Sequence, residues 1–335
     1  MRTELCKVLN IEKPIISAPM GGAVGPDLVA AVSNSGGFGA IPLWGQPVAK
    51  VRDGIAQVRA LTRRNFAVNL NLSFPYEEAL HACIDEQVHA VSLFWGEEPT
   101  AIEVAKKGGL VVLASVGTAA EAVRAVDAGA DVIVAQGWEA GGHVWGRVAT
   151  MALIPAVVDA VKVPVVAAGG IADGRGLAAA LMLGASGVWV GTRFLASKEA
   201  TIHEEYQQSI LGASESQADW YGNLYDIDWP DAPHRALSNS TSEIWASHDR
   251  PPLSARPNAG EVVGHKPNGD PVVRYQCYTP STGTSGNIEA MSLWAGQSVS
   301  LARTIMPAAA IVDEIYDDAM KVIQSANAAL LGSTQ

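Results

Sequence analysis

The stretch VIVAQGWEAGGH, residues Val132–His143, decides the fold of this chain. Its first four residues form a short apolar run, which is typical of a parallel strand covered on both faces. The glycines that follow allow a sharp turn and a close approach of the backbone to a ligand. His143 is thereby placed in a glycine loop at the carboxyl end of a strand, where an imidazole can move protons near neutral pH. Taken alone, the pattern is equally consistent with a tight turn that carries a surface histidine.

The strand-then-helix unit recurs from the N-terminus to about residue 200. Eight strands that alternate with helical patterns predict a closed (β/α)8 barrel, the TIM-barrel form of the α/β class. An open doubly wound sheet is the alternative, but that fold normally uses fewer strands. The predicted strands span residues 15–19, 38–43, 66–70, 90–94, 110–114, 132–135, 163–168 and 187–191, and the predicted helices include residues 26–35, 51–58, 77–86, 100–107, 153–161 and 175–183.

A change of composition after about Lys198 predicts an insertion. Residues 201–284 are rich in aromatic residues, prolines and polar residues and have little periodicity. We expect them to form a small lid or subdomain over the top of the barrel, which itself comprises residues 1–200 and 285–335. Asn268–Gly269, between two Val-Val pairs, indicates a hairpin within the insertion.

The C-terminal part of the chain is predicted to return to the barrel as helix. Residues 288–302 have a helical pattern, and Pro307 starts a last helix whose apolar residues recur at helical spacing. That apolar face predicts packing in the core or at an interface. The tail after Leu331 is expected to fray.

Composition excludes several classes of function. The chain has 335 residues, of which 48% are hydrophobic, so it can bury a full core. Its 23 basic and 34 acidic residues give a net charge of −11, which argues against binding to nucleic acid or to anionic membranes. Cys6, Cys83 and Cys277 are scattered, which predicts neither a disulfide framework nor a metal site. Because we find no signal peptide and no apolar run that could cross a bilayer, we expect a cytoplasmic protein.

The carboxyl ends of the predicted strands carry glycines and neutral amide or hydroxyl groups. Ligands bind at this end of such barrels, and these groups can hydrogen-bond a planar heterocycle without placing charge against it. Gly169–Gly170 and Gly191–Thr192 follow the last two strands, which is the usual phosphate position. Backbone amides there would bind a phosphate without a basic residue. Each glycine could instead serve only to turn the chain, but two such loops on adjacent strands favour a ligand site.

The joint order of these motifs resembles the nitronate monooxygenase family, formerly called 2-nitropropane dioxygenases. The resemblance covers nearly the whole chain. Two later segments, WPDAPHR at 229–235 and WAGQSV at 294–299, are also similar to that family. The earlier motifs that carry the resemblance are APMGG at 18–22, NLN at 69–71, QGWEAGGH at 136–143, AGGI at 168–171 and GTRF at 191–194.

The resemblance implies a non-covalently bound FMN in the mouth of the barrel. His143 would be the proton-handling residue beside the flavin N5. Met20 and Gly21 are implied along the isoalloxazine, and Asn69 and Gln136 at its polar edge. Gln297, from the C-terminal return, would reach the flavin region as well. Those implied on the phosphate side are Gly142, Gly169, Gly170, Gly191 and Thr192, and Gly141 is implied as a further cofactor-binding residue.

The implied reaction is the oxidation of alkyl nitronates, of the propionate 3-nitronate type, by O2 to a carbonyl compound and nitrite. His143 would hold the anionic nitronate or abstract a proton from its nitroalkane form. The partners expected are therefore this small molecule and O2, and a homodimer is one option for the assembly. FMN-dependent enoyl-acyl-carrier-protein reductases and an NADH:quinone reductase group share the Glu-Ala-Gly-Gly-His loop. An NAD(P)H-dependent flavin reductase of quinones or enoyl thioesters is therefore the alternative.

A few residues keep open interpretations at this point. Trp138 stands where the family often has a smaller residue, so it either narrows the site or packs away from it. Ser115 either donates to a ligand or caps its strand end. We expect Glu97 and Glu98 to face solvent, because acids at the mouth would repel an anionic substrate. His234 is interpreted as a structural residue.

Overall fold

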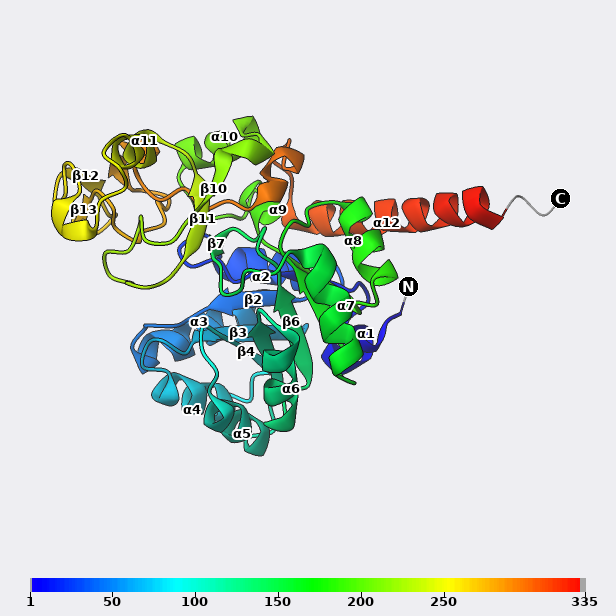
Figure 1. Ribbon diagram of the computed structural model, residues 1–335. Coiled ribbons are helices and arrows are strands. Elements are labelled where there is room, and N and C mark those ends of the chain that lie inside the picture. The colour runs from blue at the N-terminus through cyan, green and yellow to red at the C-terminus, as the bar shows by residue number, and fades with distance from the viewer. Residues whose placement is uncertain (1, 332–335) are drawn as a thin grey trace.

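Eight parallel strands form the centre of the computed structural model, which describes residues 2–331 (Figure 1). They pair in the order β1-β9-β8-β6-β5-β4-β3-β2. β1 and β2 then close the ring, because Ser17 N donates to Phe38 O at 3.0 Å and Phe38 N donates to Ile15 O at 2.9 Å. The predicted barrel is confirmed, and the open sheet is excluded. The strands are β1 (Ile15–Ser17), β2 (Gly39–Pro42), β3 (Phe66–Asn71), β4 (Ala90–Phe94), β5 (Val111–Val116), β6 (Val132–Gln136), β8 (Val165–Ala168) and β9 (Gly187–Val190).

Helices surround the barrel, and the eighth place in their ring belongs to the C-terminal helix. α12 (Ala308–Leu331) packs against α8 and α2, so it fills the position between the last and the first helix of the ring. Its Ile311, Ile315 and Ala319 are fully buried, which confirms the core face predicted for this helix. The tail expected to fray lies outside the described residues. The other ring helices are α2 (Pro26–Asn34), α3 (Val48–Leu61), α4 (Glu77–Asp85), α5 (Pro99–Lys107), α6 (Ala119–Asp127), α7 (Thr150–Ala160) and α8 (Gly174–Met182).

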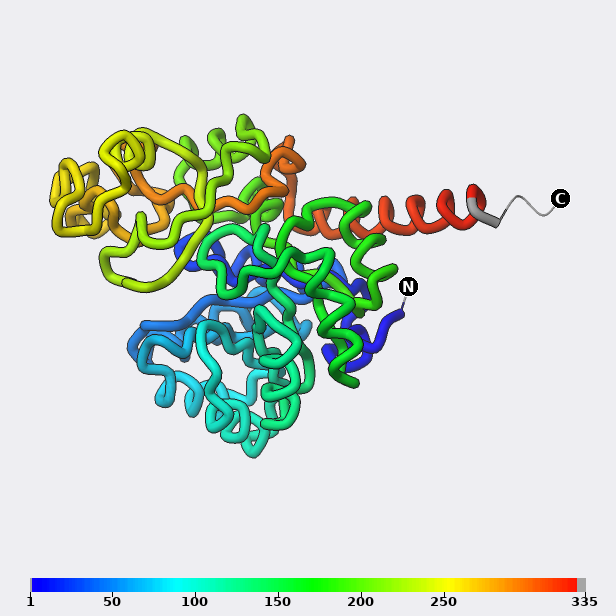
Figure 2. The backbone as a smooth tube through the Cα atoms, in the orientation of Figure 1, coloured from blue at the N-terminus to red at the C-terminus, as the bar shows by residue number. Residues whose placement is uncertain are grey.

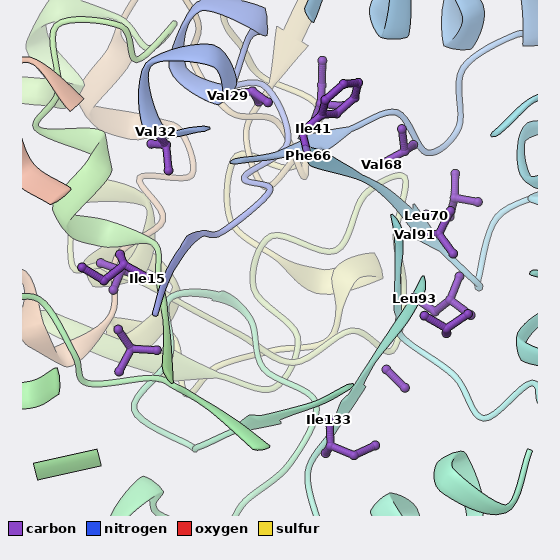
Figure 3. Packing of buried hydrophobic residues seen from close by; sticks show 14 of the residues in the cluster. Ile15, Val29, Val32, Ile41, Phe66, Val68, Leu70, Val91, Leu93 and Ile133 are labelled. Carbon is purple, nitrogen blue, oxygen red and sulfur yellow. The ribbon is translucent and has the colours of Figure 1, made fainter. Parts of the chain in front are cut away.

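The side chains of the strands alternate between two cores. One set points outward and packs under the helices, as Val68, Leu70, Val91 and Leu93 do in Figure 3. The other set fills the barrel, where Ile16, Phe38 and Leu113 meet Leu5 and Leu9 of α1 (Glu4–Leu9), a helix that we did not predict and that covers the bottom. Near the carboxyl ends the inward positions become polar. They include Asn69, Asn71, Ser92, Ser115 and Gln136.

After β9 the chain leaves the barrel, forms a cap over its top, and returns through α12 (Figure 2). We use "the cap" for residues 201–302. It contains two small sheets, ordered β10-β11-β7 and β13-β12-β14. The first sheet includes β7 (Gly142–His143), which belongs to the loop after β6. Before the cap lies α9 (Thr192–Leu195), and the other elements of the cap are α10 (Glu204–Gly212), η1 (Glu215–Gln217), β10 (Ala218–Tyr221), β11 (His234–Leu237), α11 (Ser240–Ser247), η2 (Leu253–Ala255), β12 (Val262–His265), β13 (Pro271–Val273), β14 (Ser285–Gly286), η3 (Ile288–Ala290) and η4 (Gln297–Leu301).

The cap confirms one local prediction and corrects another. β12 and β13 form the predicted hairpin, with Gly269 at a φ of 89° in its turn. The prediction of a helix over residues 288–302 is wrong, because only the short 3-10 turns η3 and η4 form there. Between them the backbone pairs with β11 instead, since Leu237 N donates to Leu293 O at 2.8 Å. The domain division at residue 284 stays a prediction, although side chains from both sides of it pack into one cluster.

Candidate active site

A cavity of about 420 Å³ lies between the carboxyl ends of the barrel strands and the cap. This volume is in the range of small-molecule and cofactor sites, about 300–1,000 Å³. Gln297 does not line the cavity, although its neighbours Gly296 and Ser298 do. Its backbone N–H donates to Glu139 O at 3.0 Å. The other predicted site residues all line it: Met20, Gly21, Asn69, Gln136, Gly141, Gly142, His143, Gly169, Gly170, Gly191 and Thr192. Their individual roles stay predictions.

The glycines of the rim are required for two different reasons. Gly169 has a φ of 100°, and a Cβ added to it would lie 2.8 Å from Gly137 O, so no other residue fits there without strain. Gly142 has a φ of 68° and open space where its Cβ would be, which leaves room for a ligand against the backbone. Gly141 is constrained by packing, since a Cβ there would lie 2.3 Å from Gly296 N of the cap.

The polar groups of the lining are held by their own bonds. Gln136 Nε2 donates to His143 O at 3.1 Å, and its Oε1 accepts from Trp145 N at 2.9 Å. Gln136 thus fixes both ends of the segment that carries the imidazole, and one of its amide protons remains for a ligand. Asn69 Nδ2 donates to Ser92 O at 3.1 Å, and its Oδ1 remains available to accept a hydrogen bond from another group.

Asn71 is a lining residue that we did not select from the sequence. Its Oδ1 accepts from both Ser73 N at 3.0 Å and Ser73 Oγ at 2.7 Å, which sets the orientation of the amide. Its Nδ2 is buried and has no hydrogen-bond partner within residues 2–331. A buried donor without a partner is costly, so the site is suited to a ligand that supplies an acceptor. The signal was present in the sequence, because Asn71 shares the inward face of β3 with Asn69.

His143 lies in a box of aromatic rings. Its ring centroid is 3.7 Å from that of Trp229, with 31° between the planes, and 5.3 Å from that of Trp294. Trp95 packs edge-on against it at 5.7 Å, from a strained backbone with a φ of 65°. Burial among these rings, and then the nearby His234, lower the pKa of His143 well below its usual range. The imidazole is therefore neutral at physiological pH.

The cap positions this imidazole directly. β7 pairs with β11 in antiparallel register, so that His143 lies opposite His234. His234 is fully buried, and its Nε2 accepts from Tyr225 N at 3.1 Å while Nδ1 lies 2.9 Å from Ala232 O. Both ring nitrogens serve the fold, in agreement with the structural interpretation. Trp294 and Cys277 were missed as lining residues, although Trp294 belongs to a family segment quoted above. Trp229, which also lines the cavity, is one of the aromatic residues of the insertion that was expected to form a lid.

Trp138, Glu97 and Glu98 all point away from the cavity. Trp138 packs away from the cavity, with its ring 4.8 Å from the Arg235 guanidinium and its carbonyl accepting from Arg235 Nη2 at 2.9 Å. Glu97 and Glu98 are exposed, as expected, and Glu97 pairs with Arg124. Ser115 lines the cavity, so a ligand contact is available to it.

The lining is free of formal charge. Among the described residues, no Asp, Glu, Lys or Arg faces the cavity, and no three His, Cys, Asp or Glu side chains within residues 2–331 are grouped as a metal site would require. The same part of the chain has no helix with the length and apolar character needed to cross a bilayer. A planar, uncharged ring system with acceptor atoms at its edge fits this site, because it matches the open space at Gly142 and the unpaired amide of Asn71.

Comparison with known proteins agrees with this geometry. The family model described as "Nitronate monooxygenase" matches residues 2–78 and 71–318. The chain is 30% identical to a probable nitronate monooxygenase of Staphylococcus aureus, over 96% of this chain and 99% of that protein. It is 38% identical to a (3aS,4S,5R,7aS)-5-hydroxy-7a-methyl-1-oxo-octahydro-1H-indene-4-carboxyl-CoA dehydrogenase of Rhodococcus jostii, but over 63% of this chain and 60% of that protein. The solved structure of FabK from Thermotoga maritima superposes with a TM-score of 0.86 and 32% identity, over 98% of this chain and all of that one.

Proposed function

The chain belongs to the nitronate monooxygenase family, and from this premise we propose that it is an FMN-dependent enzyme that oxidises alkyl nitronates with O2 to a carbonyl compound and nitrite. That it is an oxidoreductase follows from the family itself. The observation that carries the finer proposal is the neutral imidazole of His143 at a glycine-rimmed, uncharged cavity.

The proposed cofactor matches the donors and the space of the barrel side. FMN, when bound, supplies the electron chemistry between the substrate and O2. Asn69, Asn71 and Gln136 would bond its polar edge, and Gly142 leaves room for its ring beside the backbone. The turns at Gly169–Gly170 and Gly191–Thr192 would hold its phosphate through backbone amides.

His143 would orient the substrate and handle its proton. A neutral imidazole can donate a hydrogen bond to a nitronate oxygen, or accept the α-proton when the nitroalkane form binds. The aromatic box excludes water from this contact, which strengthens a hydrogen bond to the anion. The tryptophans of the cap would therefore favour binding of the delocalised nitronate group over a hydrated small ion.

The uncharged lining favours one subclass of nitronate. Propionate 3-nitronate carries a carboxylate besides its nitronate group, and a second anion would enter the cavity without a basic partner. Burying an unpaired charge costs roughly several kcal/mol, even after the surrounding protein has relaxed. We therefore propose that nitronates with uncharged alkyl tails are preferred over propionate 3-nitronate.

The proposal is tested by nitrite release. The purified, FMN-loaded protein is incubated aerobically with ethyl nitronate or propyl-2-nitronate, without a nicotinamide, and nitrite is measured. We expect turnover that His143→Ala abolishes to near background. No nitrite above the His143→Ala background would contradict the proposal.

The similarity to FabK and to the CoA-linked dehydrogenase favours a second candidate. This is an NAD(P)H-dependent flavin reductase of quinones or enoyl thioesters on the same barrel. Its signature is anaerobic bleaching of the flavin by NADH, which the nitronate reaction does not require.

A further inference from the structure

The thiol of Cys277 lies against the imidazole of His143. Its Sγ is 3.8 Å from His143 Nε2, within the range of a hydrogen bond to sulfur. Cys277 lines the cavity, whereas Cys6 and Cys83 are buried elsewhere in the barrel. The contact joins a residue of the cap to the loop after β6, two regions separated by more than a hundred residues in the chain.

The backbone around Cys277 fixes the position of the thiol. Cys277 N donates to Ile227 O at 2.9 Å, and Ile227 pairs with Gln276 in a parallel bridge. The Gln276 amide donates to Asp228 Oδ2 at 2.7 Å. Trp229 follows Asp228 directly, and its ring packs against His143 at a tilt of 31°. The two bonded cap segments therefore hold both the Trp229 ring and the Cys277 sulfur against the imidazole.

The direction of the hydrogen bond follows from the protonation states. Burial raises the pKa of Cys277 to about 12, and the carboxylates of Asp228 and Asp226 act in the same direction. The thiol therefore keeps its proton. Sulfur is a weak acceptor, whereas the unprotonated nitrogen of a neutral imidazole is a good one, so the contact favours the thiol as donor and Nε2 as acceptor. In this arrangement the ring proton of His143 is on Nδ1.

The Nδ1 atom of His143 makes no hydrogen bond in the described part of the chain. His234 is the instructive contrast, because its Nε2 and Nδ1 are both bonded to backbone groups. Since His143 lines the cavity, its Nδ1–H is the ring group that remains for a ligand.

We propose that Cys277 is a positioning residue that holds His143 in the Nδ1–H tautomer, so that His143 meets its substrate as a hydrogen-bond donor and not as a base. The role given to the substrate rests on the proposed function, whereas the tautomer does not. A fixed donor suits an anionic nitro or enolate oxygen, because it stabilises the negative charge without adding a second ion to an uncharged cavity.

The tautomer is measured directly by nitrogen-15 NMR of the histidine rings. The full-length, FMN-loaded protein is labelled on histidine, and the His143 signals are assigned by their loss in His143→Gln. We expect the neutral Nδ1–H pattern in the unmodified protein and in Cys277→Ser, because a hydroxyl also donates. Cys277→Ala should shift His143 toward the Nε2–H form, and the control Cys6→Ser should leave its signals in place. An Nε2–H ring in the unmodified protein, or no change in Cys277→Ala, would overturn the inference.

Kinetics then separate positioning from structural support. We expect kcat/KM for nitrite release to fall about five- to tenfold in Cys277→Ala, the loss of one hydrogen bond, and to recover in Cys277→Ser. Equal losses in the two variants would indicate packing alone and contradict the inference. If the unmodified protein releases no nitrite, the proposed function fails, while the ring signals still decide the tautomer.

Discussion

The two walls of the cavity differ in chemistry. The barrel wall consists of glycine turns and amide side chains at strand ends, such as Gly169, Asn69 and Gln136. The cap wall consists of aromatic rings and a thiol, from Trp229, Trp294 and Cys277. The barrel wall is suited to a bound ring and phosphate, and the cap wall buries the imidazole of His143, which lowers its pKa. We infer that the fold provides the cofactor site and the cap adapts it to a substrate.

The walls meet at the loop after β6, and this junction makes them interdependent. His143 is paired with β11 of the cap, Gly141 packs on Gly296, and Thr192 Oγ1 accepts from Gly296 N at 2.9 Å. A substitution at this junction should therefore affect both walls, whereas a substitution elsewhere should affect only the wall that carries it.

Removing the imidazole should give the largest effect. We expect His143→Ala to lower kcat/KM by about 10²–10³-fold, the usual range for the loss of one preorganised hydrogen-bond donor to an anion, while FMN absorbance after purification is retained. Trp138→Phe is the matched control in the same loop, because its ring packs away from the cavity, and it should keep its activity. Loss of FMN from His143→Ala would instead assign this residue to the cofactor wall.

Separating the walls at their junction should destabilise the fold. In Gly141→Ala the new methyl group would meet the backbone of Gly296, so we expect a loss of about 1–3 kcal/mol in the free energy of unfolding. Gly212→Ala is the control, because no atom lies within 4 Å of its added Cβ. Urea denaturation of the two variants measures the difference. Equal free energies of unfolding in the two variants would show that the close approach of Gly141 to Gly296 does not require a glycine.

The cap should also make the protein sensitive to acid. Burial lowers the pKa of His234 from 6.5 to about 4, so between these values the unfolded chain binds a proton that the folded chain does not. The free energy of unfolding should therefore fall as the pH drops from 7 to 5, by about 2 kcal/mol from this group.

His234→Gln tests this dependence, because an amide can still accept from Tyr225 N and donate to Ala232 O. The variant should lose about 2 kcal/mol less between pH 7 and pH 5 in urea denaturation. An identical loss in both proteins would mean that His234 is not responsible.

A charge at the exposed rim should produce the smallest change. Gln46 lines the mouth of the cavity and is exposed, so Gln46→Lys would place a cation near an entering carboxylate. We expect kcat/KM for propionate 3-nitronate, relative to ethyl nitronate, to rise about fivefold, which corresponds to roughly 1 kcal/mol for a solvated ion pair. Gln46→Met is the neutral control. An unchanged ratio would argue that the carboxylate does not pass this rim.

The barrel wall could be predicted from the sequence because its signals are local. Short apolar runs ending in glycine, as at Val132–Gly137, encode a buried strand and its turn within a few residues. Asn71 was overlooked only because the inward face of β3 was not followed to its end. The predicted pattern also failed at residues 288–302, since pairing with β11 overrode the helical propensity of that segment.

The cap wall could not be predicted in the same way, because it depends on distant contacts. Nothing near Cys277 in the sequence indicates that its thiol reaches a histidine more than a hundred residues earlier. Trp138 shows the reverse case, since its place beside the Glu-Ala-Gly-Gly-His motif suggested a role that its packing on Arg235 excludes.

The central claim is that nitronate, and not a nicotinamide, reduces the cofactor in this site. It is tested most directly by anaerobic titration of the purified FMN-loaded protein, with ethyl nitronate in one cuvette and NADH in another. We predict that the flavin absorbance is lost on addition of the nitronate, and that NADH leaves it unchanged over the same time. Stoichiometric bleaching by NADH with no response to the nitronate would contradict the claim.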